Sequence, residues 1–197
     1  MTLYAVRGLD QTSEAFRRGV AATAVALEAD PTALAAIMSF ETGGTFSPTI
    51  RNPQSNAVGL IQWIPSTARS VLGMSTAQIA ALSREEQLPL VLKYFRAVTR
   101  GGKRLSTVSD FYAAVFAPGF IGRADSTIMY RAPSQAYEWN KALDRNGDGA
   151  ITKGEAAGPV IAIYNTAKAR GPLTETAVDS TVPFLVGIQL LRLALKL

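Results

Sequence analysis

Apolar residues recur at the spacing of an α-helix along most of this 197-residue chain, and no other sequence feature limits the fold so strongly. Residues 13–29, SEAFRRGVAATAVALEA, have apolar positions three and four residues apart behind Ser13, a residue type that caps helix N-termini. An Asp-Pro pair at 30–31 then starts a second apolar run, which ends at the glycines 43–44. Further helices are predicted at 65–72, 75–81, 83–99 and 107–116. Because apolar and polar residues alternate only in a short stretch around 45–62, the sequence predicts an all-α fold.

The composition limits the chemistry that this chain can perform. With 48% hydrophobic residues, 197 residues are enough for one well-buried domain. The sequence contains neither cysteine nor histidine, which excludes disulfides, thiolate catalysis, histidine bases and the usual zinc ligands. An enzyme with this sequence must therefore move protons with carboxylates, tyrosine, lysine or serine.

The charge is unevenly distributed. The net charge is +5 with a pI near 9.7, and the segment from Arg84 to Arg131 has eight Lys or Arg residues but four acids. Such a basic strip suits nucleic acid, anionic lipid or an acidic wall polymer, although a role in solubility explains it equally well. The first ten residues, MTLYAVRGLD, lack the apolar segment of a signal peptide, so we expect synthesis in the cytoplasm.

Glu41 is the only acidic residue between Asp30 and Glu85, and it lies at the C-terminal end of the apolar run. The helix dipole and the apolar neighbours both disfavour a negative charge there, so both raise the pKa of Glu41. A carboxyl group that stays protonated near neutral pH can act as a general acid in glycoside cleavage. The alternative is a side chain that simply leaves the helix end for solvent.

Two motifs in this region resemble the lytic transglycosylase family of lysozyme-like folds. The family has a catalytic Glu followed by Ser or Thr and Gly, here ETGG at 41–44, and then a Gly-Leu-x-Gln-x-x-Pro-x-Thr-Ala motif. The matching residues of the second motif are Gly59, Leu60, Gln62, Pro65, Thr67 and Ala68. The third family motif, Ala-Tyr-Asn-Ala-Gly, is only echoed by DFYAAVFAPGFIG at 110–122. The resemblance covers about residues 30–125 and is closest to forms from phage particles and endolysins.

The resemblance implies a reaction and a set of site residues. Family members cleave the β-1,4 bond between N-acetylmuramic acid and N-acetylglucosamine in peptidoglycan without water. A single Glu, here Glu41, protonates the leaving oxygen and then deprotonates the C6 hydroxyl of the sugar, which closes a 1,6-anhydro ring. Residues expected to bind or orient the sugar are Gln62 and Tyr112, with Ser39, Phe116 and Tyr137 as further cleft candidates. The alternatives are that Gln62 satisfies loop backbone and that the aromatic residues belong to the core.

Residues 144–155, DRNGDGAITKGE, fit the calcium-binding loop D-x-[DN]-x-[DN]-G-x₅-E at every position. The glycine at the sixth position permits the sharp turn, and the closing glutamate is bidentate in such loops. The predicted Ca²⁺ ligands are Asp144, Asn146, Asp148, the Ala150 carbonyl, Thr152 and Glu155. Because only one such loop is present, we expect a structural clamp of the EF-hand type that joins 134–142 to 153–167. The alternative is an Asp/Asn/Gly turn without metal.

These patterns predict that the chain is divided into three segments. The segments are a lysozyme-like core at 1–135, a calcium-loop segment at 136–170, and a linker with an apolar helix at 171–197. The helix, VPFLVGIQLLRLALKL at 182–197, either packs on the domain or lies on an anionic membrane.

We expect peptidoglycan as the partner and no nucleic acid. Because no signal peptide is visible, we expect a phage lysin or a virion protein that acts on the wall. The alternatives are a muramidase that uses water, or a calcium-stabilised wall-binding or virion structural module with an inactive Glu41. A muramidase would need a second carboxylate from a distant part of the chain: Glu85, Glu86, Asp110 or Asp125.

Overall fold

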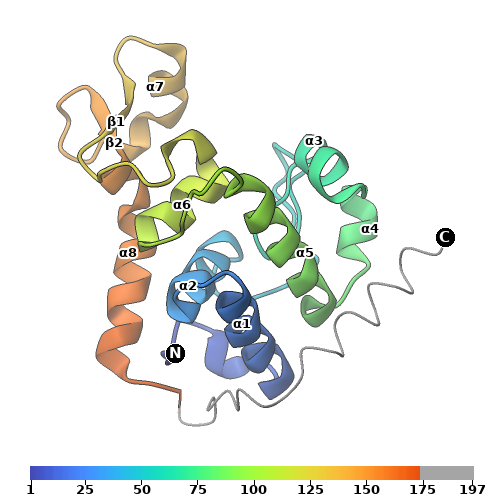
Figure 1. The fold of residues 1–197 in the computed structure, drawn as a ribbon. Helices are drawn as coiled ribbons and strands as arrows, with labels where there is room; N and C mark the ends of the chain where they lie inside the picture. The colour runs from blue at the N-terminus through green and yellow to red at the C-terminus, as the bar shows by residue number, and fades with distance from the viewer. Residues whose placement is uncertain (174–197) are drawn as a thin grey trace.

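The computed structural model describes residues 1–173, and this part of the chain is mainly helical, as the sequence predicts (Figure 1). The α-helices are α1 (Glu14–Ala26), α2 (Pro31–Glu41), α3 (Pro65–Thr67), α4 (Thr76–Ala80), α5 (Arg84–Val98), α6 (Val108–Phe116), α7 (Gln135–Asn140) and α8 (Lys153–Arg170). A π-helical turn, η2 (Ala68–Leu72), follows α3, and the 3₁₀ turns are η1 (Leu9–Gln11), η3 (Pro118–Phe120) and η4 (Lys141–Leu143). The two strands are β1 (Ile128–Arg131) and β2 (Ala150–Thr152).

Local capping chemistry explains why the helices begin where the sequence predicts. The Ser13 hydroxyl accepts a hydrogen bond from the backbone N–H of Phe16, and the Asp30 carboxylate accepts one from Thr32. The helices α4, α5, α6 and α8 each begin with a reciprocal capping box, which satisfies backbone donors that a helix leaves free. The first long helix ends at Ala26, three residues earlier than the pattern at 13–29 suggests.

Helix α2 lies at the centre of the domain. All of its residues from Pro31 to Ser39 are buried, with α1 packed on one side and α8 and α6 on others (Figure 1). Helix α5 packs against α1 and also against η2. Because α2 is apolar around its whole circumference, it can only be stable when enclosed in this way. Glu41, its last residue, is therefore carried to the edge of the core.

The two strands form a small antiparallel sheet that the sequence analysis did not predict. Tyr130 pairs with Ile151, and the register shifts between Ile128 and Tyr130. Together with α7 they form a small lobe (residues 128–152) that stands at one end of α8 (Figure 1). Since β1 precedes residue 136 and pairs inside the predicted calcium loop, the boundary expected at 135/136 runs through this lobe. The stretch 45–62 contains only isolated bridges of Val58 with Arg51 and Trp63.

The beginning of the chain pairs with the end of the described part. Tyr4 forms an isolated antiparallel bridge with Pro172, and the N–H of Ala5 donates to the carbonyl of Gly171 at 3.2 Å. The predicted apolar helix at 182–197 lies outside the described residues. Within residues 1–173, no single helix is long and apolar enough to cross a membrane; α1 and α2 reach the required length only as a pair, with a bend of 119° between them.

Candidate active site

Glu41 is half-buried at the end of α2, and its carboxyl group has no hydrogen bond or ion pair within residues 1–173. Burial raises its pKa from 4.5 to about 7, because the protein removes water from the carboxylate without offering it a partner. Most other described acids cap helices or pair with a basic or hydroxyl side chain. Glu41 is thus poised to hold and release a proton near neutral pH.

The turn after Glu41 is held by Thr42, whose side chain is fully buried. The Thr42 hydroxyl donates to the carbonyl of Met38 at 2.7 Å and accepts from the N–H of Phe46 at 3.0 Å. Gly43 follows with φ +62, and an added Cβ there would meet no atom within 4 Å. The glycine is therefore required by its left-handed backbone, and the space where a side chain would project is open. The motif's hydroxyl residue shapes the turn, a role that sequence reasoning missed.

A line of aromatic rings leads away from Glu41. The ring of Phe40 meets Tyr112 edge to face at 6.0 Å, Tyr112 stacks on Phe116 at 5.2 Å, and Phe116 meets Tyr130 at 6.1 Å. Burial raises the pKa of the Tyr112 hydroxyl, and the charges of Glu41 and Tyr130 raise it further. Tyr112 is thus close enough to Glu41 for the charge of Glu41 to act on it, and Phe116 is placed by its stacking on Tyr112. That these two residues bind sugar stays a prediction.

Tyr94 and Tyr130 also belong to these surroundings, and the sequence analysis missed both. Burial and then the charge of Glu41 raise the pKa of Tyr94 to about 12, while its hydroxyl donates to the carbonyl of Ala114 at 2.7 Å. Tyr94 is on α5 and Tyr130 on β1, so only the tertiary structure brings them to α2 and α6. In the sequence, each looks like any aromatic residue of a core or a strand.

Gln62 sits in a tight turn with φ +50, a conformation that is uncommon for a residue with a side chain. Its amide nitrogen donates to the carbonyls of Gly59 at 3.0 Å and Ile50 at 3.2 Å. The side chain therefore does satisfy loop backbone, the alternative that the sequence left open. Its amide oxygen takes no hydrogen bond from residues 1–173, so it remains an acceptor for a ligand.

The side chain of Gln87 on α5 forms hydrogen bonds with the loop that carries this turn. The sequence analysis did not single this residue out. Its fully buried amide accepts from the N–H of Leu60 at 3.0 Å and donates to the carbonyls of Pro48 at 2.8 Å and Ile79 at 3.0 Å. A Cβ at Gly59 would lie 2.5 Å from the Gln87 oxygen, which explains the glycine of the second motif. A polar residue on the apolar face of α5 was the signal that could have revealed it.

Two of the predicted cleft residues make contacts in the interior of this structure. Ser39 is fully buried, and its hydroxyl donates to the carbonyl of Arg7 at 2.9 Å, so it cannot reach a sugar. Tyr137 is also buried, in the small lobe, and its hydroxyl donates to Asp144 at 2.7 Å. Both side chains hold the fold together because helical spacing placed them on inward faces.

The four acids that could supply a second carboxylate are engaged elsewhere. Asp110 pairs with Lys153 at 2.5 Å in the interior, and Asp125 accepts from the hydroxyl of Ser109 at 3.0 Å. Glu85 accepts from the Ser13 hydroxyl at 2.6 Å, and Glu86 caps α5. None of them contributes to the pKa of Glu41.

The predicted calcium loop is closed by its own polar side chains. The two carboxylate oxygens of Asp144 accept from the N–H groups of Gly147 at 2.8 Å and Gly149 at 3.0 Å. The Asn146 oxygen accepts from Asp148, whose carboxylate accepts from Ala150, both at 2.9 Å. Thus the side chains at loop positions 1, 3 and 5 accept hydrogen bonds from backbone N–H groups of the loop itself.

Glu155, the twelfth loop residue, provides the test of whether a cation fits. One of its carboxylate oxygens accepts from the N–H of Thr152 at 2.9 Å, whereas the other is buried and has no hydrogen-bond partner. An unpartnered buried carboxylate oxygen is costly without a ligand, and all the donors are oxygens, as Ca²⁺ prefers. Within residues 1–173, however, no three acidic side chains are gathered closely enough to hold a metal ion in the arrangement described.

Comparison of the chain with protein-family models and with curated proteins finds no match. The likeness to lytic transglycosylases therefore rests on the two sequence motifs.

Proposed function

We propose that this protein is a peptidoglycan lytic transglycosylase with a lysozyme-like core, in which Glu41 is both the catalytic acid and the catalytic base. One observation carries the proposal: the carboxyl group of Glu41 is half-buried, has no partner within residues 1–173, and has a pKa of about 7. At that pKa roughly half of the molecules hold the proton at neutral pH, which suits a group that must both give and take a proton.

The reaction follows from the two protonation states of one carboxyl group. Protonated Glu41 gives its proton to the glycosidic oxygen while the bond from C1 of N-acetylmuramic acid to that oxygen breaks. The resulting carboxylate then accepts the proton of the C6 hydroxyl, whose oxygen forms a new bond to C1. Glu41 is protonated again at the end, and no water is consumed.

The engagement of the other acids supports ring closure over hydrolysis. An inverting or retaining hydrolase needs a second carboxylate to activate water or to attack C1. Asp110, Asp125, Glu85 and Glu86 each have a hydrogen-bond partner of their own, and none affects the pKa of Glu41. An intramolecular hydroxyl needs no second base, because it is already positioned beside C1.

The surroundings of Glu41 supply contacts suited to a sugar. Phe116 and Tyr130 are partly exposed aromatic rings, whereas Tyr112 is 6% exposed and supports Phe116 from the core by stacking on it. The Gln62 amide oxygen is a hydrogen-bond acceptor in a rigid turn. Gly43, two residues after Glu41, borders open space. We assign binding and orientation of the glycan to these residues, with peptidoglycan as the partner of a phage lysin or virion protein.

Calcium has a structural role in this proposal. Asp144, Asn146, Asp148, Thr152, Glu155 and the Ala150 carbonyl would hold it, and the unpartnered oxygen of Glu155 supports the fit. A bound Ca²⁺ would supply positive charge at the centre of the loop and take no part in the sugar chemistry. The loop side chains would then hold α7 against the start of α8.

Mass spectrometry of digested peptidoglycan tests the proposed reaction. Wild-type protein should release muropeptides that end in 1,6-anhydro-N-acetylmuramic acid, about 18 Da lighter than hydrolytic products because no water is added. The matched control is Glu41→Gln, which should release neither product. Reducing-end products would show a muramidase instead, and absence of any cleavage by the wild type would leave a binding or structural module.

A further inference from the structure

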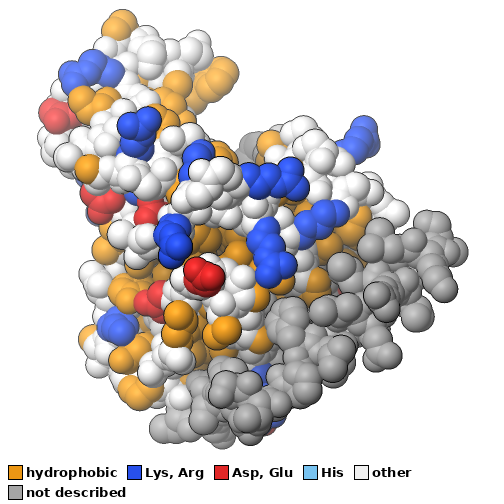
Figure 2. Space-filling view, viewed as in Figure 1, with side chains coloured by type: hydrophobic (Ala, Val, Ile, Leu, Met, Phe, Trp, Pro, Cys, Tyr) orange, Lys and Arg blue, Asp and Glu red, His pale blue; other side chains and the backbone are white. Residues whose placement is uncertain are grey.

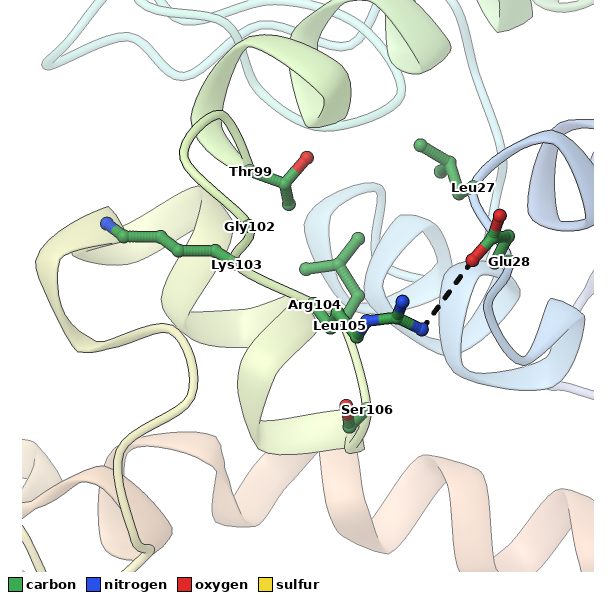
Figure 3. A pocket seen from close by; sticks show the side chains of 8 residues that line it. All are labelled: Leu27, Glu28, Thr99, Gly102, Lys103, Arg104, Leu105 and Ser106. Atoms are coloured by element: carbon green, nitrogen blue, oxygen red, sulfur yellow. Dashed lines mark ion pairs between the residues drawn. The ribbon is translucent and has the colours of Figure 1, made fainter.

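A polar pocket lies between the end of α1 and the loop that follows α5. It has a volume of about 270 Å³, and its walls include Leu27, Glu28, Thr99, Arg104, Leu105 and Ser106 (Figure 3). Glu28 lies just before the N-cap of α2, whereas Glu41 is the last residue of that 11-residue helix. A helix of this length spans roughly 16 Å, so the pocket is separate from the candidate active site.

Glu28 and Arg104 face each other across this pocket (Figure 3). The guanidinium Nη1 of Arg104 lies 3.6 Å from the Glu28 carboxylate, and the two side chains are 78% and 81% exposed. An ion pair this long and this exposed contributes little stability, so both groups can exchange partners cheaply. Glu28 has φ +53, an uncommon backbone state for a residue with a side chain.

The pocket is lined by two cations, Lys103 and Arg104, and one acid, Glu28, and the chain around Lys103 and Arg104 is basic. No acid occurs between Glu86 and Asp110, while five exposed cations lie in this stretch: Lys93, Arg96, Arg100, Lys103 and Arg104. Some of these cations donate to backbone carbonyls, such as Lys103 to Pro118 at 3.0 Å, but those carbonyls leave the net charge in place. Figure 2 shows Lys and Arg side chains gathered over the middle of this face of the molecule.

We propose that this pocket binds the peptide stem of peptidoglycan, an inference that rests on the proposed function and adds a second contact for the same polymer. A stem peptide carries carboxylates and a free amine on short side chains. Arg104 can take a carboxylate with two parallel hydrogen bonds, and Glu28 can take the ammonium. Leu27 and Leu105 offer apolar surface between them, and Thr99 and Ser106 have hydroxyls for the peptide backbone.

The test is a calorimetric titration of the full chain carrying Glu41→Gln with free stem tetrapeptide, released from peptidoglycan by an amidase. We expect binding that Arg104→Gln weakens tenfold or more, the loss expected for one charged hydrogen-bonded pair. Glu28→Gln should weaken binding of the tetrapeptide but not of the same peptide with its amines acetylated. The matched control is Lys141→Gln, an exposed lysine of the small lobe, which should leave binding unchanged.

Three outcomes would overturn this proposal: no binding of the tetrapeptide, equal binding by Arg104→Gln, or Arg104-dependent binding of polyphosphate or DNA in its place. Glycan strands stripped of peptides keep the two proposals apart. If wild-type protein still converts them to anhydro products while the tetrapeptide fails to bind, the pocket proposal fails alone. If the tetrapeptide binds but no anhydro product forms from any substrate, the proposed reaction fails and the peptide site stands.

Discussion

Lys153 Nζ lies 2.5 Å from the Asp110 carboxylate in the interior of the protein, and this ion pair joins the predicted calcium loop to α6. The two side chains are 1% and 3% exposed. Lys153 also donates to the carbonyl of Arg123 at 2.8 Å, and Asp110 accepts from the N–H of Gly122 at 2.8 Å. Because Tyr112 follows Asp110 on the same helix, the loop and the candidate active site share one rigid support.

Lys153→Met should destabilise the protein by about 3–5 kcal/mol, because it leaves a buried carboxylate without its cation. Urea unfolding monitored by circular dichroism measures this. The double variant Asp110→Asn with Lys153→Met should recover a good part of the loss, since neither charge then remains. A single variant that unfolds like the wild type would show that the pair carries no net energy.

The Lys153–Asp110 pair also predicts that the stability of the protein depends on pH. Burial acts to raise the pKa of Asp110, but hydrogen bonds from Lys153, Gly122 and Thr107 outweigh it and leave the pKa below 3.8. The contribution is therefore complete above about pH 4 and declines as the pH falls through the lowered pKa. Asp110→Asn should flatten the unfolding free energy below about pH 4, where the wild-type curve falls.

The raised pKa of Glu41 predicts that the free energy of unfolding falls as the pH rises toward 7. Because its pKa rises from 4.5 to about 7 on folding, the wild type should lose stability between those values and stay level above them. Glu41→Gln should therefore match the wild type near pH 4 and exceed it by up to about 3 kcal/mol near pH 8, at about 1.4 kcal/mol per pKa unit. Thermal unfolding across this pH range measures the difference.

The activity of the wild type should depend on pH through the protonation of the Glu41 carboxyl group. If protonated Glu41 is the acid, kcat/KM for peptidoglycan should fall tenfold per pH unit above about 7. Glu41→Gln should lower the rate by roughly 10²–10⁴-fold or more at pH values up to about 7. A wild-type profile that is flat from pH 6 to pH 9 would exclude this carboxyl group as the proton donor.

Calcium should raise the melting temperature without changing the products. A ligand at about 100 times its dissociation constant adds roughly 2.7 kcal/mol to the folded state. Glu155→Gln should lose most of this response, whereas Glu138→Gln, an exposed acid outside the loop, should keep it. Equal responses in all three proteins, or in Mg²⁺ as in Ca²⁺, would contradict a calcium site in the loop.

Gln87→Leu should cost several kcal/mol, because the N–H of Leu60 and the carbonyls of Pro48 and Ile79 lose their buried partner. It should also loosen the turn that carries Gln62 and raise KM for peptidoglycan. Chemical denaturation and steady-state kinetics measure the two effects. The matched control is Gln78→Leu, which removes only an exposed capping side chain of α4.

The helices and part of the site follow from local sequence. Ser13, Asp30 and Ser83 cap helices because a side-chain oxygen needs only the next turn of backbone to bond with, and this information is contiguous in the chain. The position of Glu41 at the end of α2 is equally local, since the apolar run and the following glycines define it.

What could not be predicted depends on contacts between distant segments. Tyr94 of α5 is close enough to Glu41 for the charge of Glu41 to raise its pKa, and β1 pairs with the loop strand some 20 residues later. Ser39 and Tyr137 had suitable chemistry, but only the packing reveals that both face inward. Gln87 was hidden for the same reason, since its three partners lie in three different segments of the chain.

The enclosure of α2 has a consequence for biosynthesis. Its residues 31–39 are all buried in the folded protein, yet α8, which covers one of its faces, ends about 130 residues after Glu41. At about 5–20 residues per second, a ribosome needs roughly 6–26 s to make that stretch. During this interval the nascent chain presents an uncovered apolar helix. The yield of the protein in cells should therefore depend on chaperones that bind apolar segments of nascent chains until α8 has been synthesised.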